Sequence, residues 1–154
     1  MTQGAAAQAE GTTTAQAVYT ASATSTGDGR NGHVRSSDGI LEADLATPTE
    51  MGGRGGATNP EQLFAAGFSA CFHSALKAVA SQHKVSTKDS AVTADVGIAP
   101  REDGGFGLSV TLHVELTGVT EEQAKAVVDA ADAVCPYTHA TRGNIPVSIE
   151  IDIV

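Results

Sequence analysis

The chain has 154 residues, of which 41% are hydrophobic, and this is enough for one domain with an apolar core. Its 9 basic and 18 acidic side chains give a formal net charge of −9. That balance argues against nucleic acid and anionic membranes as partners, because both bind proteins through basic surfaces. We also predict no membrane-spanning segment, because no apolar run approaches about 18 to 20 residues.

The first 16 residues are small and polar, and we predict a disordered tail at 1–16 followed by a single domain at 17–154. The tail lacks the basic and apolar regions of a signal peptide, so we expect the protein to stay in the cytoplasm. Cysteines of cytoplasmic proteins are more often reactive than structural, which directs attention to the two in this chain.

The early part of the domain is predicted to form strands joined by glycine-rich loops. Residues 17–24 and 39–47 are rich in side chains that favour strands. Between them, GDGRNGH at 27–33 contains three glycines, Asp and Asn, which predicts a loop carrying Arg30. A second glycine-rich connection at 51–58 lacks the Gly-Lys-Ser/Thr ending of a phosphate-binding loop.

A long helix is predicted to begin at Pro60. Asn59 can cap it, and Gln62 completes an approximate capping box. Apolar residues cover nearly its whole circumference and include Cys71. Such a helix belongs in the centre of a fold. One small sheet would not cover it fully, which favours a subunit interface.

The second half of the chain continues with clear patterns. Alternating segments at 91–100 and 106–116 predict a β-hairpin, and an alternating strand at 147–154 ends the chain. Between them, a helix is predicted at 120–135, with Cys135 on its apolar stripe. The order of elements predicts an α+β domain of mostly antiparallel sheet with two main helices.

The two cysteines lie on the apolar stripes of different predicted helices, so packing on one sheet could bring their sulfurs together. Their spacing matches no zinc-ligand pattern, and we predict no metal site. Two interpretations of Cys71 and Cys135 are open at this point: small hydrophobic core residues, or a reactive thiol pair. His73 and His139 adjoin the cysteines in sequence, and we predict structural roles for both.

A reactive cysteine in apolar surroundings needs a nearby cation, because burial disfavours the thiolate. The candidates are Arg30, Arg54 and Arg142. An arginine in an apolar pocket itself needs a carboxylate partner, and Glu61 in the first turn of the long helix is a candidate. An acid at that position is equally explained by its favourable interaction with the helix N-terminus.

Two longer motifs carry a family resemblance. TNPEQLFAAGFSACF and VCPYTHATRGNIPV closely resemble the two cysteine signatures of the organic hydroperoxide resistance proteins, within the OsmC-like superfamily. The GRNGH loop and the SSDG segment resemble that family's arginine loop and the segment after it. The resemblance runs from about Tyr19 to the C-terminus. It implies the OsmC-like α+β fold, with the first helix central and buried in an intertwined homodimer.

The resemblance also implies an activity, that of a thiol-dependent peroxidase reducing organic hydroperoxides to alcohols. Cys71 matches the peroxidatic cysteine and Cys135 the resolving one, while Arg30 matches the active-site arginine and Glu61 its partner carboxylate. The family binds no cofactor, and its usual reductant is dihydrolipoamide carried on lipoylated proteins. An apolar pocket suits bulky organic hydroperoxides. We expect three side chains to line it: Leu63, Phe68 and Phe72.

The arginine loop departs from the family's pattern. It is one residue longer than usual, Asn31 stands where an acid is usual, and His33 stands where a second arginine is common. Arg54 falls in a link where the family usually carries no arginine, so Arg30 is the better candidate. His139 replaces a commoner Asn, and we assign it no chemical role.

Helix geometry adds a constraint on Glu61 and Cys71, which are ten residues apart in one predicted helix. At about 1.5 Å per residue they are separated by about 15 Å along the axis, too far to serve one pocket. Either the helix breaks after its first turn, or Glu61 reaches the cysteine of another subunit. Two alternative functions are an OsmC-type peroxidase of different substrate range and a non-catalytic thiol protein with a redox-sensing or structural role.

Overall fold

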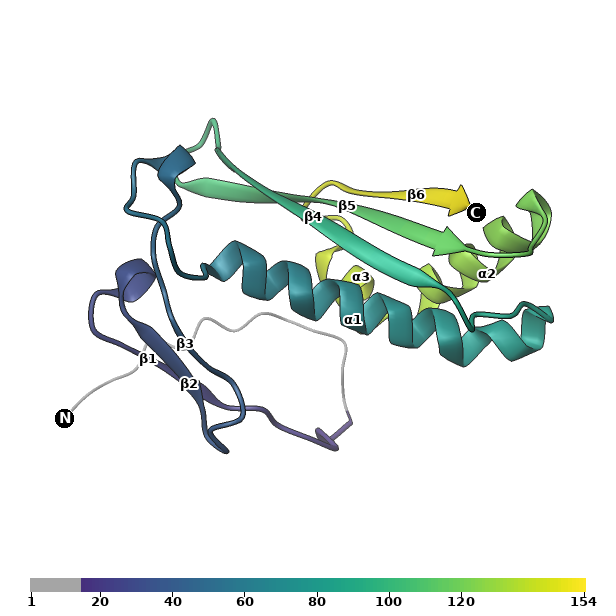
Figure 1. The fold of residues 1–154 in the computed structure, drawn as a ribbon, viewed down its shortest axis with the longest axis horizontal. Coiled ribbons are helices and arrows are strands. Elements are labelled where there is room, and N and C mark those ends of the chain that lie inside the picture. Colours follow the sequence, from purple (N-terminus) through teal and green to yellow (C-terminus); the bar gives the residue numbers. More distant parts are fainter. Residues whose placement is uncertain (1–14) are drawn as a thin grey trace.

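The computed structural model describes residues 15–154, so most of the predicted tail at 1–16 lies outside the described residues. This part of the chain forms two separate three-stranded sheets, with one long helix running between them (Figure 1). The predicted α+β class, with two main helices and mostly antiparallel sheet, is therefore confirmed.

The first sheet is an antiparallel arm of three short strands: β1 (Ala23–Thr26), β2 (His33–Ser36) and β3 (Glu42–Asp44). All four residues of β1 are exposed in the single chain. The predicted first strand at 17–24 is displaced toward the C-terminus in the structure, and β2 begins inside the predicted loop. Without a buried face, these strands lack the alternation by which a strand is recognised in sequence.

The second sheet contains the predicted hairpin of β4 (Ala91–Pro100) and β5 (Phe106–Leu116). The last strand, β6 (Val147–Ile153), pairs with β5 in parallel. A parallel pair requires a crossover, and the helices between β5 and β6 supply it. The inward residues of β5 are buried: Val110, Leu112, Val114 and Leu116.

Helix α1 (Pro60–Ala80) begins where the sequence predicts. The side chain of Asn59 accepts a hydrogen bond of 2.9 Å from the backbone N–H of Gln62. The Gln62 side chain accepts from the hydroxyl of Thr58 at 2.8 Å, so the capping box is only half formed. The helix packs against β4 and α2, and its buried residues are Phe68, Phe72, Ala75, Leu76, Val79 and Ala80.

Together with the turn that follows it, α1 spans Pro60–His83 and is long and apolar enough to cross a membrane by length and composition. This corrects the expectation that no apolar run approaches that length. The central helix of a globular core passes the same test, and α1 packs against a sheet and a second helix. However, only 28% of its 18-residue apolar window is buried in the single chain. The rest of this window is exposed or only partly covered in the single chain.

Helix α2 (Glu121–Val134) starts with a complete capping box between Thr120 and Gln123, and α3 (Pro136–Thr141) follows it directly. Short 3₁₀ turns are found at Gly29–Asn31, Thr49–Met51 and Ser81–His83. Cys135 was predicted to be the last helical residue, but its backbone is extended, with φ −68° and ψ 122°. The following Pro136 explains this, because a residue before proline is disfavoured in the helical conformation.

Candidate active site

The two cysteines meet at the packing of α1 against the α2–α3 junction. Cys71 is partly exposed and Cys135 is fully buried. Their Sγ atoms are 3.9 Å apart, and both thiols are free. A disulfide is about 2.05 Å long, so a shift of roughly 2 Å would join them. Two distant cysteines are thus brought within reach of each other by helix packing.

The surroundings of Cys71 disfavour its thiolate in the single chain. Burial is the largest cause that raises the pKa of this thiol, and the neighbouring Cys135 raises it further. One contact acts in the opposite direction, because the backbone N–H of Tyr137 is hydrogen-bonded to the Cys71 sulfur. An efficient nucleophile at this position therefore needs additional positive charge.

Arg30, the cation that the sequence favours for this role, lies on the 3₁₀ turn between β1 and β2 and forms an ion pair with Glu61. Its Nη1 donates to Oε2 at 2.9 Å and its Nη2 donates to Oε1 at 2.6 Å. This bidentate geometry makes the ion pair stronger than one with a single hydrogen bond. The Glu61 side chain is 13% exposed. The hydrogen bonds from Arg30 are the main cause that lowers the pKa of its carboxyl.

The turn that carries Arg30 is held by contacts that the sequence did not indicate. The Asn31 side chain accepts a hydrogen bond from the backbone N–H of Thr47 at 3.0 Å, and Gly32 accepts one from Leu45 at 2.9 Å. A Cβ added to Gly32 would lie 2.1 Å from the carbonyl oxygen of Thr26, so only glycine fits there. The composition of the loop predicted a turn but not these partners.

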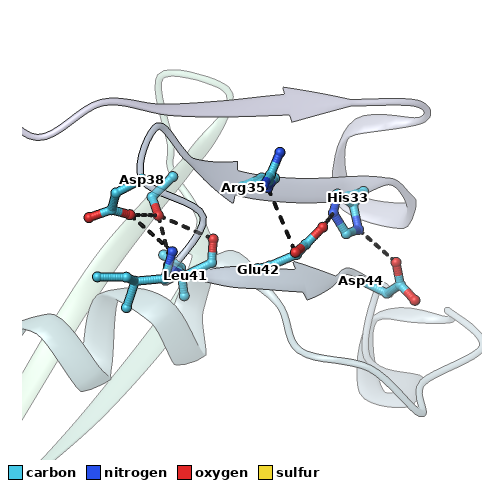
Figure 2. Close-up of polar contacts among 8 residues, drawn as sticks. His33, Arg35, Asp38, Leu41, Glu42 and Asp44 are labelled. Carbon is cyan, nitrogen blue, oxygen red and sulfur yellow. Dashed lines mark hydrogen bonds and ion pairs between the residues drawn. The ribbon is translucent and has the colours of Figure 1, made fainter.

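His33, at the start of β2, links this strand to β3 (Figure 2). Its Nδ1 lies 2.8 Å from Asp44 and its Nε2 lies 3.2 Å from Glu42, both on β3. The hydrogen bond to Asp44 is the largest cause that raises the pKa of this imidazole. Carboxylate oxygens only accept hydrogen bonds, so both contacts are satisfied together only when the ring is protonated.

The other basic candidates lie in different surroundings. Arg54 donates to the backbone oxygen of Leu45 at 3.2 Å, and Arg142 pairs with Asp132 at 2.7 Å. His73 lies 3.0 Å from the hydroxyl of Ser90, a contact consistent with the structural role predicted for it.

The structure brings the predicted site residues together as two separate pairs. α1 is continuous from Pro60 to Ala80, so Glu61 and Cys71 belong to one unbroken helix. A break after the first turn is therefore excluded. Within one chain, the Arg30–Glu61 pair lies about 15 Å along the helix axis from the thiol pair.

The predicted pocket residues differ in their burial. Phe68 and Phe72 have no exposed surface in the single chain and are part of the core. Leu63 is half-buried. Phe64 and Tyr137, which the sequence did not single out, pack against Phe68 at ring-centroid distances of 5.8 and 5.5 Å. Tyr137 is 38% exposed. Contact of Leu63, Phe68 and Phe72 with a substrate stays a prediction.

An open groove of about 720 Å³ lies beside Glu61. The first turns of α1, including Glu61 and Ala65, form one side, and β4 from Ala94 to Ile98 forms the other. Within residues 15–154, no cluster of three or more His, Cys, Asp or Glu side chains could hold a metal ion. Three carboxylates line the groove, those of Glu50, Glu61 and Asp95, and the one of Glu61 is paired with Arg30.

Comparison with known proteins identifies the family. The model of the family described as OsmC-like protein matches residues 53–150. The chain belongs to the OsmC-like family. An organic hydroperoxide resistance protein of Xanthomonas axonopodis pv. citri is 49% identical over 136 residues, which cover 87% of this chain and 94% of that protein. An uncharacterized protein of Acinetobacter baylyi is 57% identical over 137 residues, covering 88% and 94%.

Solved structures agree with this assignment. The crystal structure of an organic hydroperoxide resistance protein from Elizabethkingia anophelis has a TM-score of 0.85 and 49% identity, and the match covers 91% of this chain and all of that one. A similar protein from Legionella pneumophila has a TM-score of 0.84 and 49% identity, with coverage of 89% and 99%. The predicted resemblance to organic hydroperoxide resistance proteins and the predicted OsmC-like fold are both confirmed.

Proposed function

We propose that this protein is a cysteine-based peroxidase that reduces organic hydroperoxides to alcohols. The observation that carries the proposal is the 3.9 Å separation of the Cys71 and Cys135 sulfurs, in a chain 49% identical to an organic hydroperoxide resistance protein. A pair of core cysteines without a chemical role has no need to face each other across two helices.

The proposed reaction has three steps. The Cys71 thiolate attacks the peroxide O–O bond and becomes a sulfenic acid. The alkoxide that leaves takes up a proton and is released as the alcohol. The Cys135 thiol then displaces the sulfenic oxygen as water, and a Cys71–Cys135 disulfide forms. A dithiol reduces this disulfide by exchange and is itself oxidised to a disulfide. The proposed reductant is dihydrolipoamide on lipoylated proteins, and no resident cofactor takes part.

The proposal places the active site between two copies of the chain. α1 is unbroken, so the Arg30–Glu61 pair of one subunit serves Cys71 of the partner subunit. Two observations support a homodimer: the apolar surface of α1 that the single chain leaves uncovered, and the open groove beside Glu61. In such a site, the guanidinium of Arg30 would offset the burial that disfavours the thiolate.

Substrate preference follows from the apolar surroundings of the thiol. An alkyl or aryl hydroperoxide gains about 25 cal/mol for each Å² of apolar surface that it buries, and hydrogen peroxide has no such surface. Leu63, Phe68 and Phe72 are the proposed contacts. A location in the cytoplasm also stays a prediction.

Rapid mixing of the reduced protein with cumene hydroperoxide or hydrogen peroxide, followed by thiol counting, tests the activity. We expect fast loss of both thiols with the organic peroxide and slow loss with hydrogen peroxide. Cys71→Ser should abolish the fast phase. Equal rates with both peroxides would favour an OsmC-type peroxidase of different substrate range. Slow and unselective oxidation would instead indicate a non-catalytic thiol protein.

A further inference from the structure

Gly67 lies in the interior of α1, at a position where glycine is not required by the backbone. It is absent from the glycines that adopt a positive φ. Glycine in the middle of a helix is less favourable than alanine. A reason for glycine must therefore come from what packs against this position.

The group that packs there is Tyr137. A Cβ added to Gly67 would lie 3.1 Å from the Tyr137 hydroxyl oxygen and 3.4 Å from its Cε2 atom. The first of these distances is tighter than an ordinary contact, so the tyrosine would have to move. The missing side chain at Gly67 thus allows the end of the Tyr137 ring to rest directly on α1.

The same ring is fixed on its other sides by aromatic contacts. It meets Phe68 edge-on, with centroids 5.5 Å apart and an interplanar angle of 61°. It is tilted against Phe64 at 6.3 Å. Ring positions of this kind are specific in geometry, because aromatic pairs prefer edge-on or offset arrangements. Three residues of α1 therefore determine where Tyr137 sits.

The position of Tyr137 matters because of its backbone. Gly67 and Cys71 are four residues apart and so lie on the same face of α1. Tyr137 adjoins both residues: the end of its ring packs at the Gly67 position, and hydrogen bonding from its backbone N–H is the one cause that lowers the pKa of the Cys71 thiol. Tyr137 also follows Cys135 by two residues, so the peptide is attached to the segment that carries the second thiol.

We propose that Gly67 is a positioning residue, whose lack of a side chain lets Tyr137 close on α1 and aims the Tyr137 backbone N–H at the Cys71 sulfur. This N–H favours the thiolate over the thiol, because a hydrogen bond to the charged form stabilises it. The contribution comes from within one chain and is separate from that of Arg30. It deepens the proposed function, since it acts on the nucleophile of that reaction.

The test uses a background in which Cys135→Ala leaves Cys71 as the sole thiol, because the chain has only two cysteines. The rate of alkylation by iodoacetamide is measured against pH, and the profile yields the Cys71 pKa without any peroxide. In this background, Gly67→Ala should raise the pKa by about half a unit to one unit. The alkylation rate at pH 7 should fall about three- to tenfold.

A compensating substitution gives the sharpest control. Tyr137→Phe removes the hydroxyl that the new Cβ meets, while the ring and the backbone N–H are retained. Alone, it should leave the Cys71 pKa unchanged. Combined with Gly67→Ala, it should restore the pKa toward that of the background. Tyr137→Ala keeps the N–H but loses the aromatic packing, and it should raise the pKa as Gly67→Ala does.

The proposal is overturned if Gly67→Ala leaves the pKa unchanged or if the double variant fails to restore it. If Gly67→Ala does not fold, Tyr137→Ala decides, and an unchanged pKa in that variant overturns the proposal. A purely structural role for Gly67 would shift the thermal midpoint without moving the alkylation profile. Failure of the peroxidase assay would leave these thiol measurements intact, so the two proposals fail separately.

Discussion

The arm (residues 23–44) and the core around α1 are held together in different ways, and the arm contains Arg30 while the core contains the two cysteines. The core buries apolar side chains from α1, α2 and β5, and its two thiols face each other across that packing. The arm has exposed strands, linked by ion pairs such as those of His33. The proposed thiol chemistry requires a defined separation of the two sulfurs, which tight packing provides. The arginine lies on a segment with few buried contacts, where displacement costs less free energy.

The largest expected effect comes from removing the contribution of the arm to the chemistry. Arg30→Ala should slow the loss of Cys71 thiol with cumene hydroperoxide about 100- to 1000-fold, the range seen when one charge-stabilising group is removed from an active site. Stopped-flow mixing measures this rate. Arg54→Ala is the matched control, since Arg54 contacts only a backbone oxygen among the contacts described for it and should change little. Similar losses in both variants would contradict the assignment of Arg30.

The next largest effect is expected in the free energy of unfolding, which should fall more for a substitution in the core than for one in the arm. Leu112 of β5 is fully buried, and Leu112→Ala should lower the free energy of unfolding by about 3 kcal/mol. Val34 of β2 is only half-buried in the single chain, and Val34→Ala should cost about 1 kcal/mol or less. Urea unfolding measures both. A cost at Val34 as large as that at Leu112 would mean that the arm is as firmly buried as the core in solution.

Glu61 joins the two regions, and its replacement should have an intermediate effect. Glu61→Gln keeps the shape but removes the charge that holds Arg30, and we expect the peroxide reaction to slow about tenfold, the effect of one unit in thiol pKa. Because the folded pKa of Glu61 is lowered, the pair should stabilise the protein fully above the unfolded value of about 4.3. That contribution is lost as the pH falls through the lowered value.

The difference in unfolding free energy between the parent and Glu61→Gln, measured from pH 6 to pH 2, isolates this titration. It should be constant at the upper end of that range and shrink toward the lower end. A difference that grows on acidification would show that the carboxylate is not held by Arg30.

The smallest effect is expected at His33. Its pKa is raised, so the bridge to Asp44 and Glu42 should be complete below the ordinary histidine value of about 6.5 and should be lost as pH rises through the higher folded value. Proton NMR of the imidazole measures this directly. Titration at or below the ordinary value would contradict the bridge. His33→Gln should remove the pH dependence of the arm and alter the peroxide reaction less than Arg30→Ala or Glu61→Gln does.

The same division explains what the sequence could predict. The hairpin, both main helices and the caps at Asn59 and Thr120 were correctly predicted, because buried faces impose periodicity and caps are local signals. In the arm, β3 lies within the predicted strand at 39–47, but β1 is displaced from 17–24 and β2 is not among the predicted strands, because exposed segments carry no such period. Cys135 is predicted to be the last helical residue, but Pro136 disfavours the helical conformation at the residue before it and ends the helix one residue earlier.

The candidate site was predictable to the extent that it could be matched to motifs. The Arg30–Glu61 contact and the proximity of the thiols are both observed, while their catalytic roles stay predictions. Asn31 and Tyr137 were not predicted, because each acts through a contact with a distant part of the chain. No periodic pattern or short motif reports such contacts.

The distance between the sulfurs also affects how easily Cys71 would be irreversibly oxidised. Under the proposed chemistry, the gap of 3.9 Å has room for little more than the oxygen of a sulfenic acid, and Cys135 has about 2 Å to travel before it closes the disulfide. To produce the irreversible sulfinic acid, a second peroxide molecule must reach Cys71 before the disulfide closes. We therefore expect Cys71 to escape irreversible oxidation during a brief exposure to peroxide. Under sustained exposure, the supply of dithiol would be exhausted before the nucleophile is destroyed.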